Sequence, residues 1–257
     1  MAPFIDILAL EETTLLMAAV VFAYVAVAGL FTMRANDALG LKNALRGAAV
    51  PIASLGLVAT IFGLWGEMVW QYPAPYLTGY NILFNDIYLL FGVTLVIAGV
   101  SMALGLKLQY AGLFALVAGG VTISYGYQGW ILGYTKDPFE TFLLYGAFGL
   151  AGLLALPATV MVDHFLAHPE TTVVPVTSAA SVARRHSIQA STRAVQPIVP
   201  VGSDGTPDPA SSVRTRFHIP LYVVLPVLAF VVAMALAGFA ALWYLDATLP
   251  GHLASPP

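Results

Sequence analysis

Long apolar runs, separated by short polar segments, account for most of the sequence. A membrane helix needs about 20 mostly apolar residues to cross about 30 Å of hydrocarbon. Six runs meet this requirement, at roughly residues 13–33, 48–69, 82–105, 110–133, 139–165 and 217–244. The pattern therefore predicts an all-α protein, a polytopic membrane helix bundle with six transmembrane helices.

Residues 169–215 interrupt this pattern. They are rich in Ser, Thr, Val, Ala and Pro and show neither a helical nor a strand period. Such a segment lacks the regular apolar face that a packed element needs, so we expect a disordered loop. The chain is thereby divided into a five-helix membrane bundle at 1–168, the loop at 169–215, and a sixth helix with a short outer tail at 216–257.

Basic side chains are distributed unevenly over the predicted loops. If the N-terminus lies outside, the inner side holds nine of the ten Lys and Arg residues, namely Arg34, Lys42, Arg46, Lys107, Arg184, Arg185, Arg193, Arg214 and Arg216. The outer side holds Lys136. Basic loops stay in the cytoplasm, although the arginines of a long loop count for less. The asymmetry predicts that both termini lie outside, and we expect the cell membrane as the location.

Composition supports a membrane environment and excludes several kinds of chemistry. Hydrophobic residues make up 59% of the 257 residues and charged residues only 9%, whereas a soluble domain averages about 25% charged. The net charge of −3 and the lack of a basic tract argue against nucleic acid as a partner. The absence of cysteine excludes disulfides and thiolate chemistry. Because no basic residue accompanies Asp6, Glu11 and Glu12, we expect the first run to be a retained span.

Two carboxylates, Glu67 and Asp86, are predicted to lie at one depth near the outer boundary. Arg46 to Glu67, and Asp86 to Lys107, each span about 31 Å of helix at ~1.5 Å per residue. Four amides could join them: Gln71, Asn81, Asn85 and Gln128. Carboxylates and amides are oxygen ligands that suit Ca²⁺ or Mg²⁺, so a polar or cation site is one hypothesis. The identity of any metal is left open.

A structural polar network is the simpler interpretation of the same residues. Asn81 is a good N-cap for the third helix, and Asp86 near that N-terminus is favoured by the helix dipole.

Aromatic residues predicted at the same level form an interfacial belt, which includes Trp65, Trp70, Tyr80, Tyr88, Trp130, Trp243 and Tyr244. The histidines are predicted at or beyond the membrane boundaries, and we interpret Asp163 and His164 as a solvated helix end. The sequence contains no catalytic motif. We therefore expect no cofactor.

The run from Tyr80 to Gly92 reads Y-N-I-L-F-N-D-I-Y-L-L-F-G. It resembles the signature Y-N-I-L-F-x-D-x-Y-L-L-F-G of a family of small prokaryotic multi-pass membrane proteins that is catalogued only as a domain of unknown function. The resemblance extends over roughly Arg46 to His164. It implies a membrane bundle, and it implies no activity, cofactor or substrate.

Small residues recur at spacings that let helices approach closely. Gly146, Gly149 and Gly152 recur every third residue, and Ala233 and Ala237 are four apart. Such positions favour close packing of membrane helices. We interpret them as ordinary packing within the bundle and not as a dedicated dimer motif.

Three functions are compatible with these features. The first is a structural or accessory subunit of a membrane complex, with the lipid bilayer and other membrane subunits as partners. The second is a small cation- or proton-coupled transporter or channel that uses the outer carboxylates. The third is a membrane enzyme that acts on a lipid or quinone at the outer interface. The lack of catalytic motifs places the accessory role first and the enzyme last.

Overall fold

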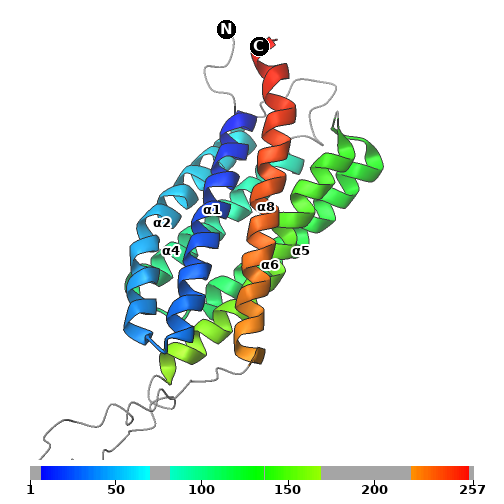
Figure 1. Ribbon diagram of the computed structural model, residues 1–257. Helices are drawn as coiled ribbons and strands as arrows, with labels where there is room; N and C mark the ends of the chain where they lie inside the picture. Colours follow the sequence, from blue (N-terminus) through cyan, green and yellow to red (C-terminus); the bar gives the residue numbers. More distant parts are fainter. Residues whose placement is uncertain (1–6, 70–81, 136, 169–220, 255–257) are drawn as a thin grey trace, which may run out of the picture. The chain divides into compact units, whose positions relative to one another are not determined.

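The computed structural model describes residues 7–69, 82–135, 137–168 and 221–254. It contains α1 (Ile7–Arg34), α2 (Ala38–Val69), the π-helical turn η1 (Ile82–Asp86), α4 (Ile87–Leu104), α5 (Gln109–Leu132), α6 (Pro138–Ala167) and α8 (Leu221–Ala254) (Figure 1). Six helices in this part of the chain are long and apolar enough to cross a membrane, which confirms the predicted all-α class. The expected 169–215 loop lies outside the described residues, as do Trp70, Gln71, Tyr80 and Asn81.

The helices extend beyond the apolar runs, for example at the start of α2. Asn36 ends the preceding turn with a φ of 55°, and the Asp37 side chain accepts a hydrogen bond of 2.7 Å from the Gly40 backbone N–H. An acidic side chain in this position satisfies an amide that the first helical turn leaves free. The helix therefore begins at Ala38, about ten residues before the apolar run that predicts it.

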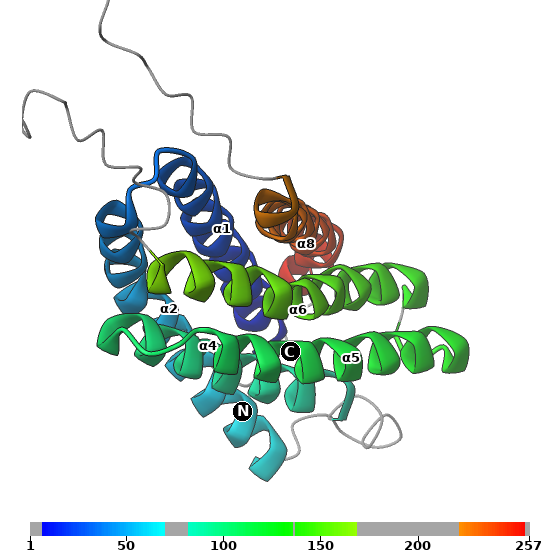
Figure 2. The ribbon, with the colours of Figure 1, turned by 90° about the horizontal axis from the view of Figure 1, so that it is seen from below.

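The six long helices form a closed ring of neighbours. Each packs against the next along the chain, in the order α1, α2, α4, α5, α6 and α8, and α8 packs back against α1. Seen from below, α1 and α8 lie on one side and α4 and α5 on the other, with α6 between them (Figure 2). The segment 216–257, which the sequence sets apart, thus contributes a helix to the same compact unit as the first five.

Glycines bring two helix pairs into backbone contact. A Cβ at Gly119 of α5 would lie 2.5 Å from the Gly149 carbonyl oxygen of α6, and one at Gly152 would lie 2.6 Å from the Ala115 oxygen. In the α2/α4 pair, a Cβ at Gly56 would lie 2.6 Å from the Val96 nitrogen. Distances under 3 Å leave no room for a side chain, so these glycines set the helix separation. Gly149 and Gly152 therefore serve packing within the chain.

A carboxylate from α6 fixes the start of α5. Asp163 accepts hydrogen bonds from the backbone N–H groups of Leu108 (2.9 Å) and Gln109 (2.8 Å). These amides have no partner within their own helix because they belong to its first turn. The expected solvated helix end at Asp163 is thus corrected: this side chain caps a neighbouring helix.

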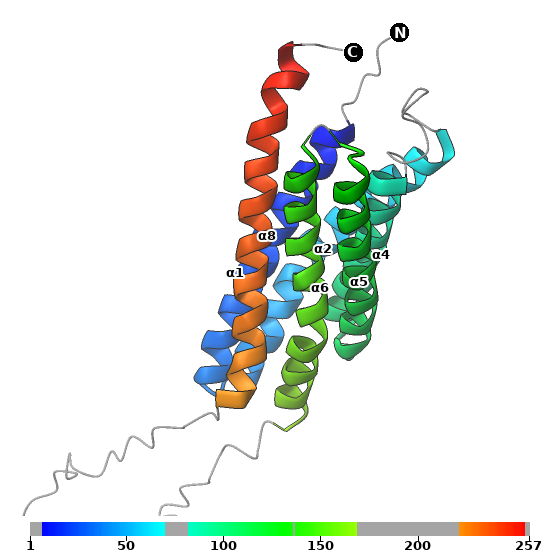
Figure 3. The same ribbon diagram turned by 90° about the vertical axis from the view of Figure 1, so that its right-hand side faces the viewer.

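The ring has two distinct ends. The terminal end is where α1 begins and α8 ends, and the basic end is where α1 ends at Arg34 and α2 begins (Figures 1 and 3). Lys42 and Arg46, in the first turns of α2, and Lys107, after α4, also belong to the basic end. The structure contains no membrane, so the side on which each end lies is a prediction from the charge asymmetry.

Cysteine labelling of this cysteine-free chain tests the orientation. Lys107→Cys places a thiol at the basic end, and Asp137→Cys, before α6, places one at the terminal end; both native side chains are exposed. An impermeant thiol reagent applied to intact cells should label position 137 and not position 107, because basic segments stay in the cytoplasm. Labelling restricted to position 107 would reverse the assignment.

Neighbouring glycines of α5 test the close helix contact. Gly119→Ala should destabilise the protein by about 1–3 kcal/mol, because the new methyl group overpacks a backbone contact. Gly120→Ala is the control, since nothing lies within 4 Å of a Cβ there. Its effect should be neutral or stabilising by up to about 1 kcal/mol. Thermal unfolding in detergent measures both, and equal effects would contradict the packing argument.

Candidate functional site

A cavity of about 160 Å³ lies at the centre of the ring. Every one of the six long helices contributes to its lining. On α1 the lining runs from Glu11 to Gly29, a rise of about 27 Å at ~1.5 Å per residue. The cavity is therefore long and narrow, and it follows the axis of the bundle.

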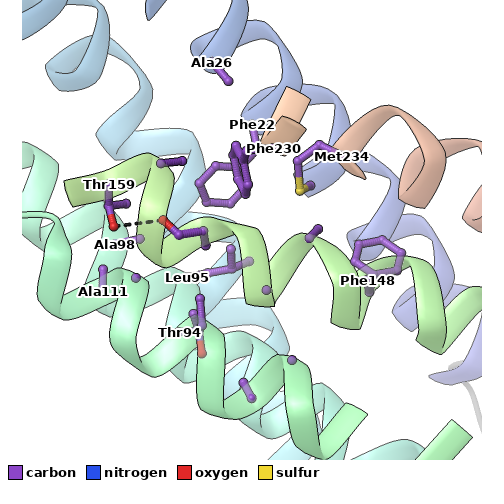
Figure 4. Close-up of a pocket in the computed structure, with 18 of the residues that line it drawn as sticks. Phe22, Ala26, Thr94, Leu95, Ala98, Ala111, Phe148, Thr159, Phe230 and Met234 are labelled. Atoms are coloured by element: carbon purple, nitrogen blue, oxygen red, sulfur yellow. Dashed lines mark hydrogen bonds between the residues drawn. The ribbon is translucent and has the colours of Figure 1, made fainter. Parts of the chain in front are cut away.

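The walls of this cavity are almost entirely apolar. Phe22 of α1 and Phe230 of α8 meet edge to face with their ring centroids 6.2 Å apart, and Phe91 of α4 meets Phe148 of α6 at 5.9 Å. Figure 4 shows Phe22, Phe230 and Met234 together on one wall. An apolar cavity of comparable volume stays dry and binds small apolar molecules. The centre of the ring suits an apolar occupant better than a hydrated ion.

A second hollow, of about 400 Å³, adjoins the cavity at the basic end. Leu45, Met102 and Leu108 line both hollows. Lys42, an exposed side chain of α2, lines only the second one. The cavity is thus continued toward the basic end by a more polar space.

Two adjacent carboxyl groups, Glu11 and Glu12, are buried at the terminal end of the bundle. Their exposed fractions are only 3% and 2%. Glu11 lines the central cavity, and its Oε2 has no hydrogen-bond partner among the described residues. The 22 residues from Glu12 to Arg34 span about 33 Å of helix, which predicts a boundary position for Glu12. The structure places both acids inside the protein. Ionisable groups buried within membrane segments are functional candidates because burying them is costly.

Tyrosine and threonine hydroxyls surround this acid pair. Tyr88 of α4 donates a buried hydrogen bond of 2.9 Å to Thr14 of α1. Tyr244 of α8 lies close enough to Glu11 and Glu12 for electrostatic interaction, and its hydroxyl is 3.3 Å from that of Thr141. Tyr88 and Tyr244 are 1% and 5% exposed. These two tyrosines are buried in the protein, where their hydroxyls join helices, and their depth at the interface stays a prediction.

Glu67 of α2 and Asp86 of η1 lie close enough to interact directly. Tyr125 of α5 donates a hydrogen bond of 3.3 Å to Asp86 Oδ2. Oε1 of Glu67 is buried and has no hydrogen-bond partner among the described residues. The structure thus brings together the two carboxyl groups that the sequence places at one depth. It adds a tyrosine that sequence reasoning does not identify.

The amides predicted to join this pair have different positions. Asn85 is 1% exposed and packs against Gly66 of α2, where a Cβ would collide with its side chain. Gln128 is exposed on α5, one turn beyond Tyr125. Trp65 and Trp130 are 43% and 39% exposed, and their interfacial position stays a prediction.

The π-helical turn η1, which contains Asp86, is bound to α6 by a hydrogen bond. Tyr145 of α6 donates a hydrogen bond of 2.9 Å to the Leu83 carbonyl. Such turns shift the backbone hydrogen bonds of a helix and often occur at functional sites. Within the described residues, no group of three or more His, Asp or Glu side chains could hold a metal ion.

The acid pair on α1 is the part of the site that sequence reasoning misses. Its signal is the adjacency of Glu11 and Glu12 at the beginning of an apolar run, without a basic residue nearby. From the sequence alone, that feature indicates a retained first span and a boundary position for Glu12, and it does not indicate a buried acid pair. The contacts to Tyr88 and Tyr244 depend on helices that are distant in sequence.

A family model described as "Protein of unknown function (DUF981)" matches residues 1–183. The chain belongs to the DUF981 family. The match covers the first five long helices, and α8 lies beyond it. No curated protein and no solved structure matches the chain. The expected relation to a family of unknown function is confirmed, and the prokaryotic origin stays a prediction.

A double-mutant cycle tests whether Glu67 and Asp86 act as one unit in this DUF981 protein. Glu67→Gln and Asp86→Asn should be non-additive in unfolding free energy, by about 0.5–3 kcal/mol, because interacting residues share their environment. Glu140→Gln combined with Asp86→Asn is the control. Glu140, an acid in the first turn of α6, is not among the groups that interact with Glu67 or with Tyr125. Thermal unfolding of the four proteins of each cycle gives the coupling. Additivity in the first cycle would show that the two carboxyl groups are independent.

Proposed function

We propose that the protein holds one apolar, chain-like molecule drawn from the membrane within its ring of helices. The observation that carries this proposal is the central cavity, to which all six helices contribute apolar side chains. A bundle that serves only as a structural support would gain stability by filling this space, since unfilled apolar volume weakens packing. The length and narrowness of the cavity favour a chain over a compact molecule.

This proposal is closest to the third function that the sequence leaves open, an action on a membrane lipid or quinone. It differs in placing the molecule inside the ring and in assigning no reaction. Binding alone requires a cavity of matching shape and apolar walls. The phenylalanine pairs, which join α1 to α8 and α4 to α6, supply such walls.

A cation or proton site at Glu67 and Asp86 is a second candidate function. It is favoured by the direct interaction of these carboxyl groups and by the unpartnered oxygen of Glu67. Two close carboxylates are costly to ionise together, so a shared proton or a bound cation would stabilise them. Transport, however, needs a polar path, and the cavity walls are apolar. We therefore propose local binding at this pair.

The accessory role stays a prediction. Many large apolar side chains on the described helices are exposed, among them Tyr24, Phe31, Val50, Met68 and Phe239. These surfaces suit lipid as well as a partner subunit, because both are apolar. Copurification of a second subunit would support this role, and it would be compatible with ligand binding.

Filling the cavity tests the proposed function. Ala118→Phe introduces a large side chain at a cavity-lining position of α5, and Val117→Phe is the control at a neighbouring site that is 59% exposed. If the proposal is right, a lipid-like molecule copurifies with the unmodified protein. The first variant should lose this molecule because the phenyl group of Phe occupies its space, whereas the second variant should retain it. Native mass spectrometry followed by lipid extraction measures both, with melting temperature as a check on folding. Equal ligand content in folded variants would overturn the proposal.

A further inference from the structure

At the terminal end of the bundle, the central cavity is lined by the carboxyl group of Glu11, one oxygen of which receives no hydrogen bond from the described residues. Glu11 is 97% buried, since only 3% of its surface is exposed, and it lines the cavity. Its Oε2 has no hydrogen-bond partner among the described residues. A buried acceptor without a partner destabilises the protein, and more strongly when it is charged.

The hydroxyls near Glu11 direct their hydrogens elsewhere. Tyr88 donates to Thr14 at 2.9 Å, and Thr14 donates to the Leu10 carbonyl at 2.7 Å. Thr13 donates to the Ala9 carbonyl, also at 2.7 Å. None of these hydrogens reaches Oε2 of Glu11, so the oxygen is left available to a molecule in the cavity.

The titratable groups that interact with Glu11 are acids or tyrosines, and none of them is basic. Glu12 is its neighbour on α1, and Tyr88 of α4 and Tyr244 of α8 are the titratable groups that interact with it. Asp137, before α6, also faces Tyr244. The described Lys and Arg side chains belong to the basic end. Arg34, for example, lies about 35 Å along α1 at ~1.5 Å per residue.

We infer that the molecule in the cavity carries a hydrogen-bond-donating end group, a hydroxyl or an amine, that binds Glu11. This inference rests on the proposed function and adds the chemistry of the ligand's polar end. A donor satisfies Oε2, and a cationic amine also balances the charge of an acid pair in an apolar site. A carboxylate or phosphate end is disfavoured, because it brings a further negative charge and no donor.

Three probes with one chain length test the inference. Hexadecan-1-ol, hexadecylamine and hexadecanoate are each added to the full-length purified protein in detergent, and binding is measured by native mass spectrometry. The alcohol or the amine should bind about 10- to 100-fold more tightly than hexadecanoate, as expected for a buried hydrogen bond to a carboxyl group. Equal binding of all three, or preference for hexadecanoate, overturns the inference while leaving the proposed function intact.

Variants of Glu11 identify the group responsible. Glu11→Leu should remove the preference for the donor-ended probes and retain chain binding, because the cavity is unchanged. Asp246→Asn is the control, since this exposed acid lies near the same end on α8. A preference that persists in a folded Glu11→Leu protein overturns the inference. Should that variant not fold, the ranking of the three probes on the unmodified protein decides.

A comparison of Glu11→Gln with the unmodified protein separates hydroxyl from amine. Glutamine keeps an acceptor oxygen and removes the ionisable group, so alcohol binding should persist, whereas amine binding should fall about tenfold or more. The probe that binds the unmodified protein more tightly names the kind of end group, and alcohol binding that is lost in a folded Glu11→Gln protein would contradict hydrogen bonding to this acceptor. Failure of every probe to bind the unmodified protein, including in the absence of competing lipid, would overturn both the inference and the proposed function.

Discussion

The close approach of helix backbones at glycine is the constraint on which the rest of this structure depends. Gly56 and Gly99 draw α2 and α4 together, and Gly119, Gly149 and Gly152 do the same for α5 and α6. Membrane helices gain little from apolar burial alone, since lipid is also apolar, so close packing contributes much of their association. Because the closest contacts lie between neighbours in the ring, the helices do not collapse onto the axis, and a cavity is left there.

Hydroxyl groups join the helices across this ring. Tyr88 connects α4 to α1 through Thr14, and Tyr145 connects α6 to η1 through the Leu83 carbonyl. In a membrane, buried polar groups must find partners inside the protein because water is absent. These bonds satisfy the hydroxyls, and they also position Glu11 beside the cavity. The same network that stabilises the terminal end therefore shapes the polar end of the proposed binding site.

The two carboxyl sites differ in what surrounds them. Glu67 and Asp86 are partly exposed and face Tyr125, whereas Glu11 and Glu12 are buried inside the ring. The partial exposure of the first pair suits the proposed binding of a proton or cation. The second adjoins apolar walls, and Oε2 of Glu11 has no hydrogen-bond partner among the described residues. This contrast underlies the separate roles proposed for the two pairs.

The sequence by itself determined the number of spans, because each must hold about 20 apolar residues in a row. It also determined the shared depth of Glu67 and Asp86, because helix rise is constant. Only the tertiary structure decided that Tyr88 and Tyr244 point into the bundle, that Asp163 caps α5, and that Glu11 lines a cavity. Apolar runs facing lipid and apolar runs facing a cavity look alike in sequence, so the direction of each side chain depends on which helices become neighbours.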